Sequence, residues 1–228
     1  MLFRSIVALI HRALDLGVNF IDTAAQYKTE PVIGAALKSV PRDKVVISTK
    51  AWINEAETLF SPEQVIASLD NSLRQLGTDH VDVFMLHGVS TRTYPHARDV
   101  IVPALMKEKA RGKFRTLGIT EFPPRDHDHA MLQGALKDDP WDVIMIAFHM
   151  MHQNARASIF PRTRQQRVGT LLMFAVRSIF SRPDRLREVA RLLADRGDMP
   201  ADMATRENPL DFLIHAGGAN NLADAAYR

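Results

Sequence analysis

The chain of 228 residues contains no cysteine and no long hydrophobic run. Without cysteine, disulfide bonds and thiolate catalysis are excluded, and a reducing compartment, the cytoplasm, is the expected location. The N-terminal stretch, residues 1–17, is too interrupted by polar residues to span a membrane and lacks a small-residue cleavage site. It is better explained as an amphipathic helix that ends at Gly17. We therefore expect no membrane contact.

Glycine-rich phosphate loops are also missing. The sequence contains neither GxGxxG nor GxxxxGK[ST], the motifs that follow a strand in dinucleotide-binding and P-loop folds. A GxSxG motif is absent as well, so a serine hydrolase has no support. The absence of a glycine-rich phosphate loop weighs against a doubly wound sheet, which remains the runner-up fold.

Lysine is absent from residues 153–197, where ten arginines stand against three acidic residues, in a chain of net charge +3. An arginine-rich belt can bind phosphate or nucleic acid. However, leucine, valine and alanine recur between these arginines at helical spacing, which is typical of the solvated face of a helix. We therefore expect no nucleic-acid partner.

Apolar, β-rich runs alternate with helical patterns along the chain. The expected strands are residues 18–22, 45–49, 81–86, 114–119, 141–148 and 168–174. The expected helices are residues 3–16, 30–39, 61–77, 98–111, 129–137 and 183–196, and residues 154–167 are expected to be partly helical. This alternation predicts a parallel sheet with crossover helices, and polar residues at the strand ends favour a TIM-type barrel. Because a closed barrel has eight strands, six predict an incomplete α/β barrel with an open seam, in one domain over residues 1–228.

Side chains with useful chemistry follow three successive strands. Asp22 ends the first strand, Tyr27 lies in the loop behind it, and Lys50 and His87 end the next two strands. In a barrel such ends adjoin at one mouth, where active sites lie. Singly, each residue is best explained structurally, as a turn cap, a packed aromatic, a surface cation and a core histidine. Jointly, the four favour a catalytic site.

Four segments carry a family resemblance. GVNFIDTAAQY, ISTK, SLRQLGTDHVDVFMLH and RGKFRTLGIT follow one another with the order and spacing of the aldo-keto reductase family, which the chain resembles from about Leu14 to Ile119 and more weakly to its end. The resemblance implies NADPH-dependent reduction of an aldehyde or ketone to an alcohol, or the reverse. The implied partner is a small-molecule carbonyl or alcohol substrate.

The resemblance also implies a role for each of the four side chains. Hydride addition leaves negative charge on the carbonyl oxygen, so a proton donor is needed there, and Tyr27 is the implied general acid. A phenol, with a pKa of about 10, is a weak acid near neutrality. A Lys50 ammonium nearby should lower that pKa, while Asp22 would pair with Lys50. His87 would hydrogen-bond the carbonyl oxygen.

Positions implied for the NADP(H) cofactor differ from the family pattern. Thr120 and Glu121 stand where the family has Ser-Asn to hold the nicotinamide amide. Met145 replaces an amide donor on the fifth strand, and Phe174 is the candidate aromatic residue for stacking on nicotinamide. Because cofactor-binding groups are replaced, the alternative is a non-catalytic truncated remnant or interaction protein with weak or no cofactor binding.

The two ends of the chain differ from the family as well. The chain begins in the helix that follows the family's first barrel strand, and it ends before the last strand and its 2′-phosphate loop. We therefore expect a domain truncated at both ends, with open edges at Val18–Ile21 and Val168–Phe174. Unpaired apolar edges predict self-association.

Two histidine pairs raise the question of a metal site. His127 and His129 are two positions apart, and His149 and His152 are three positions apart. No third ligand at metal-site spacing accompanies either pair. A surface polar loop is the better explanation of the first pair and a crossing at a strand end of the second, so no metal is expected.

Overall fold

The structure, a computed structural model, describes residues 2–228. Contacts divide the chain into two compact units, one formed by residues up to 146 with 154–171, the other by 147–153 with 172–228. We describe each unit by itself. The single domain over residues 1–228 stays a prediction, because compact units need not fold independently.

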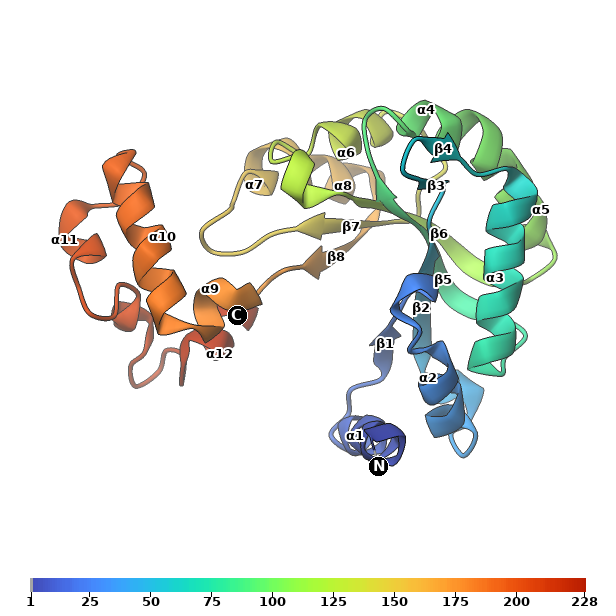
Figure 1. The fold of residues 1–228 in the computed structure, drawn as a ribbon, viewed down its shortest axis with the longest axis horizontal. Coiled ribbons are helices and arrows are strands. Elements are labelled where there is room, and N and C mark those ends of the chain that lie inside the picture. The colour runs from blue at the N-terminus through green and yellow to red at the C-terminus, as the bar shows by residue number, and fades with distance from the viewer. Residues whose placement is uncertain (1) are drawn as a thin grey trace. The chain divides into compact units, whose positions relative to one another are not determined.

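One six-stranded sheet organises the fold. Its strands, in sheet order, are β1 (Phe20–Asp22), β2 (Val46–Ala51), β5 (Val81–Val89), β6 (Phe114–Glu121), β7 (Val143–Ala147) and β8 (Gly169–Met173). This order follows the chain without the reversal that marks a doubly wound sheet. The sheet curls as part of a barrel wall, and β1 and β8 each keep one free edge (Figure 1). The predicted six-stranded, open α/β barrel is confirmed.

Helices of the first unit follow most of the strands. They are α1 (Leu2–Asp15), α2 (Glu30–Leu37), α3 (Pro62–Leu76), α4 (Tyr94–His96), α5 (Val102–Ala110), α6 (Ala130–Ala135), α7 (Ala155–Ser158) and α8 (Phe160–Gln166). The clearest sequence signal, at α3, is a capping box in which Ser61 and Gln64 bond reciprocally, and Gly77 ends the helix at φ 67°. The short hairpin β3 (Asn54–Glu55) and β4 (Thr58–Leu59) was not predicted.

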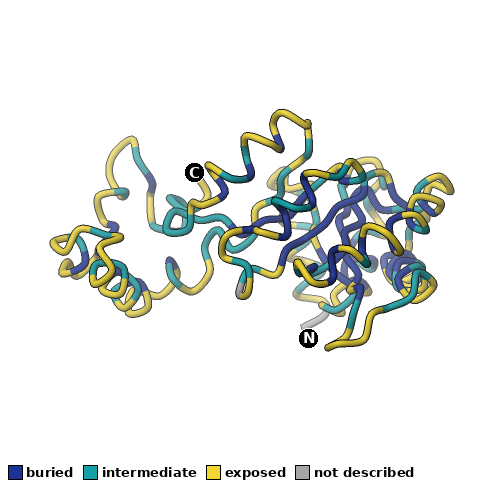
Figure 2. Tube along the Cα trace, turned by 90° about the horizontal axis from the view of Figure 1, so that it is seen from above, coloured by how far each residue is buried: buried dark blue, intermediate teal, exposed yellow. Residues whose placement is uncertain are grey.

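The core of this unit lies along β5 and β6, which are buried over most of their length (Figure 2). The ring centroids of Phe84 and Phe114 lie 5.5 Å apart between these strands, and Leu69 of α3 is fully buried. Close packing of this kind fixes the strands to one register. The carboxyl ends of the strands are therefore a rigid platform for side chains.

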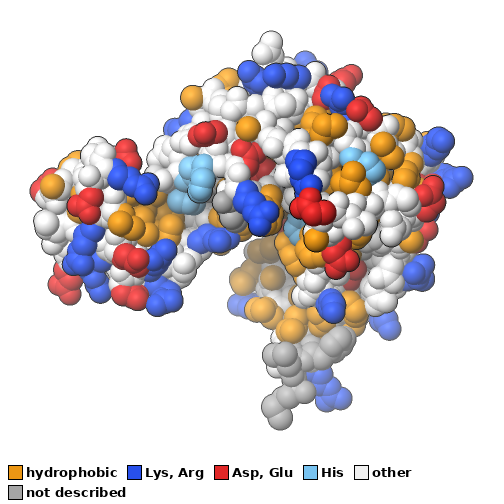
Figure 3. All heavy atoms as spheres, turned by 45° about the horizontal axis from the view of Figure 1, so that its top comes forward, with side chains coloured by type: hydrophobic (Ala, Val, Ile, Leu, Met, Phe, Trp, Pro, Cys, Tyr) orange, Lys and Arg blue, Asp and Glu red, His pale blue; other side chains and the backbone are white. Residues whose placement is uncertain are grey.

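Apolar side chains remain exposed where α1 leads into β1. Leu9, Leu16 and Val18 are each more than half exposed, and Phe20 is 36% exposed. Figure 3 shows a group of hydrophobic side chains at the surface toward the lower end of the view. No helix within residues 2–228 is long and apolar enough to cross a membrane.

The second unit is helical. It contains α9 (Arg177–Ser181), α10 (Pro183–Asp195), α11 (Ala201–Ala204), η5 (Asp211–Leu213) and α12 (Leu222–Tyr227). Phe180, Leu186 and Leu210 form its small core. In α10 the apolar stripe turns inward, because Leu186 and Ala190 are buried while Arg185 and Arg191 on either side are exposed.

Candidate active site

A short loop after β1 returns the chain over the end of its own strand. Thr23 is fully buried, and its N–H donates to Ser48 O at 2.9 Å. The hydroxyls of Thr23 and Thr29 hydrogen-bond at 2.7 Å and so close the base of the loop. Between them runs the 3-10 turn Ala25–Tyr27, followed by Lys28 at φ 56°. This turn holds Tyr27 above the carboxyl end of β1.

Lys50 is the buried centre of the site. Its side chain is fully buried, and its Nζ donates to Asp22 Oδ2 at 2.6 Å and to Thr23 O at 2.8 Å. Ser48 Oγ donates to the other Asp22 oxygen at 2.8 Å, which fixes the carboxylate. Burial lowers the pKa of Lys50, and the Asp22 charge and hydrogen bond oppose that shift. The Asp22 carboxylate thus favours the ammonium form of Lys50, which is shielded from water.

Tyr27 stands between this ion pair and solvent. Lys50 Nζ lies 5.4 Å from the centre of the phenol ring, which is half exposed. Burial, and then the charge of Asp22, raise the pKa of Tyr27 above its ordinary value. The expectation of a lowered pKa is therefore wrong for this structure, because burial and, after it, the Asp22 carboxylate disfavour the phenolate. Tyr27 holds its proton at neutral pH.

His87 completes the group from the end of β5. Its ring meets the Tyr27 ring edge to face, with centroids 5.7 Å apart. Burial and the Lys50 charge lower the pKa of His87 to about 4, against a smaller opposing effect of Asp22. The imidazole is therefore neutral near pH 7. Its Nδ1 lies 3.2 Å from Gln26 Oε1, and the Trp52 ring lies 6.4 Å away.

The structure thus brings together the four side chains that were predicted from three separate strands. A phenol with its proton is flanked by a buried ammonium and a neutral imidazole at one strand mouth. Such a group can give a proton to a small ligand and stabilise the charge left behind. Gln26 and Trp52 were missed, although both lie within two positions of a predicted site residue.

The three cofactor candidates on the sheet are all buried. Thr120 Oγ1 accepts from Gly88 N–H at 2.7 Å and keeps its own hydroxyl proton to donate. Glu121 is 2% exposed and bonds His129 Nδ1 at 2.8 Å, and Met145 offers no donor. Of the three, only Thr120 retains a group that suits a nicotinamide amide. Glu121 and Met145 stay predictions that their placement does not support.

Phe174, the fourth cofactor candidate, belongs to the second unit. Its backbone has φ 69°, and the guanidinium carbon of Arg177 lies 3.8 Å over its ring. An aromatic residue is rare in this left-handed region, so the segment is strained. The proposed stacking role of Phe174 stays a prediction.

The two histidine pairs were compared with the requirements of a metal site. Among residues 2–228, no group of three or more potential ligands could hold a metal ion. His129 is fully buried against Glu121, so the explanation of His127–His129 as a surface loop is wrong for His129. His149 and His152 face each other across an isolated antiparallel bridge.

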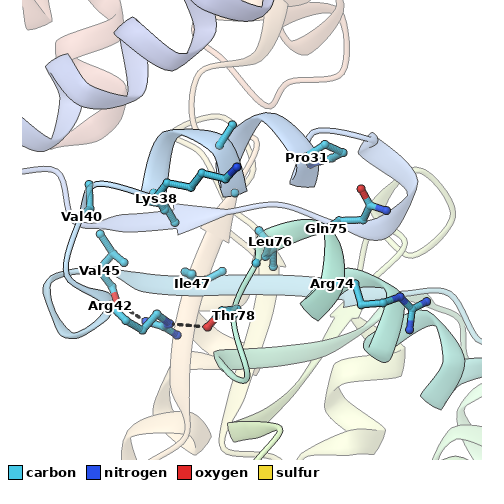
Figure 4. Close-up of a pocket in the computed structure, with 14 residues that line it drawn as sticks. Pro31, Lys38, Val40, Arg42, Val45, Ile47, Arg74, Gln75, Leu76 and Thr78 are labelled. Carbon is cyan, nitrogen blue, oxygen red and sulfur yellow. Dashed lines mark hydrogen bonds between the residues drawn. The ribbon is translucent and has the colours of Figure 1, made fainter.

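A cavity of about 530 Å³ lies elsewhere, between α2, the beginning of β2 and the end of α3 (Figure 4). Its floor includes Ile47 and Leu76, and Arg42 forms one wall by bonding Thr78 and Asp82. None of the four clustered side chains lines this cavity. This cavity lacks the group of acidic, phenolic, ammonium and imidazole side chains that meets at the strand mouth. We therefore take the strand mouth as the candidate site.

A curled parallel sheet with an acid, a phenol, an ammonium and an imidazole at one mouth is a barrel-type enzyme scaffold with a candidate active site. Residues 2–186 match the model of the Aldo/keto reductase family. The chain belongs to the aldo/keto reductase family.

Relatives of known name are similar over part of their length. L-galactose dehydrogenase of Arabidopsis thaliana is 36% identical over 122 residues, covering 51% of this chain and 38% of the relative. The NADH-specific methylglyoxal reductase of Escherichia coli is 30% identical over 167 residues, covering 65% and 49%. The solved aldo-keto reductase of Bacillus halodurans in its holo form, 25% identical, superposes with a TM-score of 0.66 over 79% of this chain and 60% of its own. The chain thus spans less than half the length of these two curated relatives.

Proposed function

We propose that this chain reduces the carbonyl group of a small aldehyde or ketone to an alcohol, or catalyses the reverse, with NADPH as hydride donor. The observation that carries the proposal is the meeting of Asp22, Tyr27, Lys50 and His87 at one strand mouth. Two relatives named for methylglyoxal reduction and L-galactose dehydrogenation support the small-carbonyl substrate class.

Tyr27 would be the general acid. As negative charge develops on the substrate oxygen, the phenol O–H donates its proton there, and a phenolate remains. The buried Lys50 ammonium, 5.4 Å from the ring centre, stabilises that phenolate more than water could. Asp22 holds the ammonium in place through its 2.6 Å ion pair.

A raised pKa of Tyr27 is compatible with this role. In the ligand-free protein it keeps the proton on the phenol, so the acid is loaded before substrate arrives. The His87 ring, neutral near pH 7, can donate a hydrogen bond from one nitrogen to the same substrate oxygen. Tyr27 and His87 would then hold the oxygen from two sides.

A nicotinamide cofactor would supply the hydride, and Thr120 is the sheet residue whose hydroxyl proton suits its amide. One relative is named as NADH-specific, so the proposed preference for NADPH needs a direct comparison of the two cofactors. Fluorescence titration with each cofactor tests binding. Micromolar affinity supports the proposal, whereas no binding at millimolar cofactor contradicts it and favours the non-catalytic remnant.

Turnover is the second test. With methylglyoxal and NADPH, the Tyr27→Phe variant should lose turnover by about 10²- to 10⁴-fold, the usual contribution of a general acid. Tyr227→Phe is the matched control, because Tyr227 is 77% exposed in the last helix. Equal activity of Tyr27→Phe and Tyr227→Phe would refute the assignment.

Two further expectations stay predictions. Self-association through the free edges of β1 or β8 would appear as a concentration-dependent mass in sedimentation. A cytoplasmic location, expected from the cysteine-free composition, would be tested by cell fractionation.

A further inference from the structure

Gln26 contacts the one imidazole of the proposed site. It precedes Tyr27 in the 3-10 turn, and its Oε1 lies 3.2 Å from His87 Nδ1. The charged groups that act on the ring are Lys50 from β2 and Asp22 from β1, while Tyr27 and Trp52 face it as uncharged rings. Gln26 is therefore the neutral hydrogen-bonding group on the ring.

A β-bulge in the backbone of β5 sets the direction of the His87 side chain. The register between β5 and β6 shifts between Leu86 and Val89, so His87 and Gly88 together stand opposite the single residue Thr120. Gly88 takes φ 65°, and its N–H donates to Thr120 Oγ1 at 2.7 Å. Bulges re-aim side chains next to active sites. Thr120, 1% exposed, is the acceptor that this bulge requires.

We propose that Gln26 and Thr120 are positioning residues: Thr120 holds the bulge that aims His87, and the Gln26 amide pairs with His87 Nδ1 whichever ring nitrogen carries the proton. This inference rests on the proposed carbonyl chemistry. It concerns two residues that act through His87 and gives Thr120 a second task besides holding nicotinamide.

The amide of Gln26 can serve both neutral forms of the ring. With Oε1 facing the ring, Nδ1–H donates to it, and Nε2 keeps a lone pair that accepts from an alcohol O–H. With the amide turned over, its NH₂ donates to Nδ1, and Nε2–H can donate to a carbonyl oxygen. The exchange conserves the single ring proton, since one proton leaves Nδ1 to water and one is taken up at Nε2. A carboxylate allows only the first arrangement, and an aliphatic side chain supports neither.

Nitrogen-15 NMR of the histidine rings tests the role of Gln26 on the full chain without cofactor. In Gln26→Glu, the added charge should fix the proton on Nδ1 and raise the pKa of His87 by about one pH unit. In Gln26→Leu, the tautomer populations of His87 should change without a rise in its pKa. Gln165→Leu is the control, because Gln165 lies exposed in α8. Ring signals of both Gln26 variants that match the control would overturn the proposal.

Kinetics add a readout that a merely structural role would not move. The acid limb of the kcat/KM profile should shift upward in Gln26→Glu, and kcat should fall about tenfold in Gln26→Leu at unchanged cofactor affinity. A uniform loss without a shift in the profile would overturn the role of Gln26. If the wild-type chain shows no turnover, the proposed function fails, while the NMR result still decides whether Gln26 controls His87.

Thr120 is tested by a conservative pair. Thr120→Val should lower kcat about tenfold, beyond any change in cofactor affinity, and Thr120→Ser should restore kcat because it returns the acceptor for Gly88 N–H. An increase in the cofactor dissociation constant without loss of kcat would overturn the bulge role and leave Thr120 as a cofactor ligand. Failure of Thr120→Ser to restore kcat would overturn it as well.

Discussion

Acid should destabilise this protein through His87. The pKa of His87 is about 4 in the folded chain, because burial and the Lys50 charge disfavour the imidazolium, against an ordinary value of 6.5. Between these values the unfolded chain binds the proton and the folded chain does not. Stability therefore falls as pH drops from about 6.5 to 4, and below 4 this residue adds no further dependence.

The size of the effect follows from the gap between the two pKa values. At 1.36 kcal/mol per pH unit, the gap corresponds to about 3 kcal/mol. Because solvent reaches part of the ring, screening reduces the expected value to about 2 kcal/mol. Against a typical total stability of about 5–15 kcal/mol, this loss is measurable.

Urea denaturation at pH 7, 5.5 and 4.5 would measure it, with wild type compared with His87→Gln. Other groups titrate in the same range, including His149, whose pKa burial also lowers. These contributions are shared by both proteins and cancel in the difference. The variant should lose about 2 kcal/mol less than wild type between pH 7 and 4.5. Parallel pH dependences in the two proteins would refute the burial of His87 beside Lys50.

Three further predictions follow from individual contacts. Lys50→Met should raise the pKa of His87, because the Lys50 charge opposes the imidazolium, and should lower turnover on the order of 100-fold. NMR titration measures the pKa and NADPH absorbance measures turnover; an unchanged pKa would contradict the interaction between Lys50 and His87. Ser61→Ala should cost about 1 kcal/mol in urea denaturation by removing the capping box with Gln64, whereas an unchanged midpoint would refute its contribution. Val18→Lys should suppress any self-association seen by sedimentation, since a charge blunts the apolar edge; association that persists would place the contact elsewhere.

The order of strands was predictable because burial and chain direction leave few alternatives. Each strand of the sheet is an apolar run bounded by turn signals, and the lack of a glycine-rich loop separated a barrel from a doubly wound sheet. The hairpin Asn54–Leu59 was missed, because its two-residue strands are too short to show a period. The π-helical turn Ala97–Ile101 was missed for a similar reason, since its apolar pattern is that of the helix it interrupts.

The meeting of the four site residues was predictable because parallel strands place their carboxyl ends together. The electrostatics were not, since a pKa depends on depth and on every neighbouring charge. Lys50 was expected to lower the pKa of Tyr27, but Asp22 and burial raise it. The partners of Glu121 and Thr120 were unpredictable as well, because His129 reaches Glu121 through an irregular loop and Gly88 reaches Thr120 through a bulge.

Turnover by matched tyrosine variants tests the central claim most directly. NADPH consumption would be followed with methylglyoxal for wild type, Tyr27→Phe and Tyr227→Phe, after circular dichroism shows that all three are folded. If the phenol above the Lys50–Asp22 ion pair is the proton donor, Tyr27→Phe loses nearly all turnover and Tyr227→Phe loses none. Equal turnover in the three proteins would contradict it.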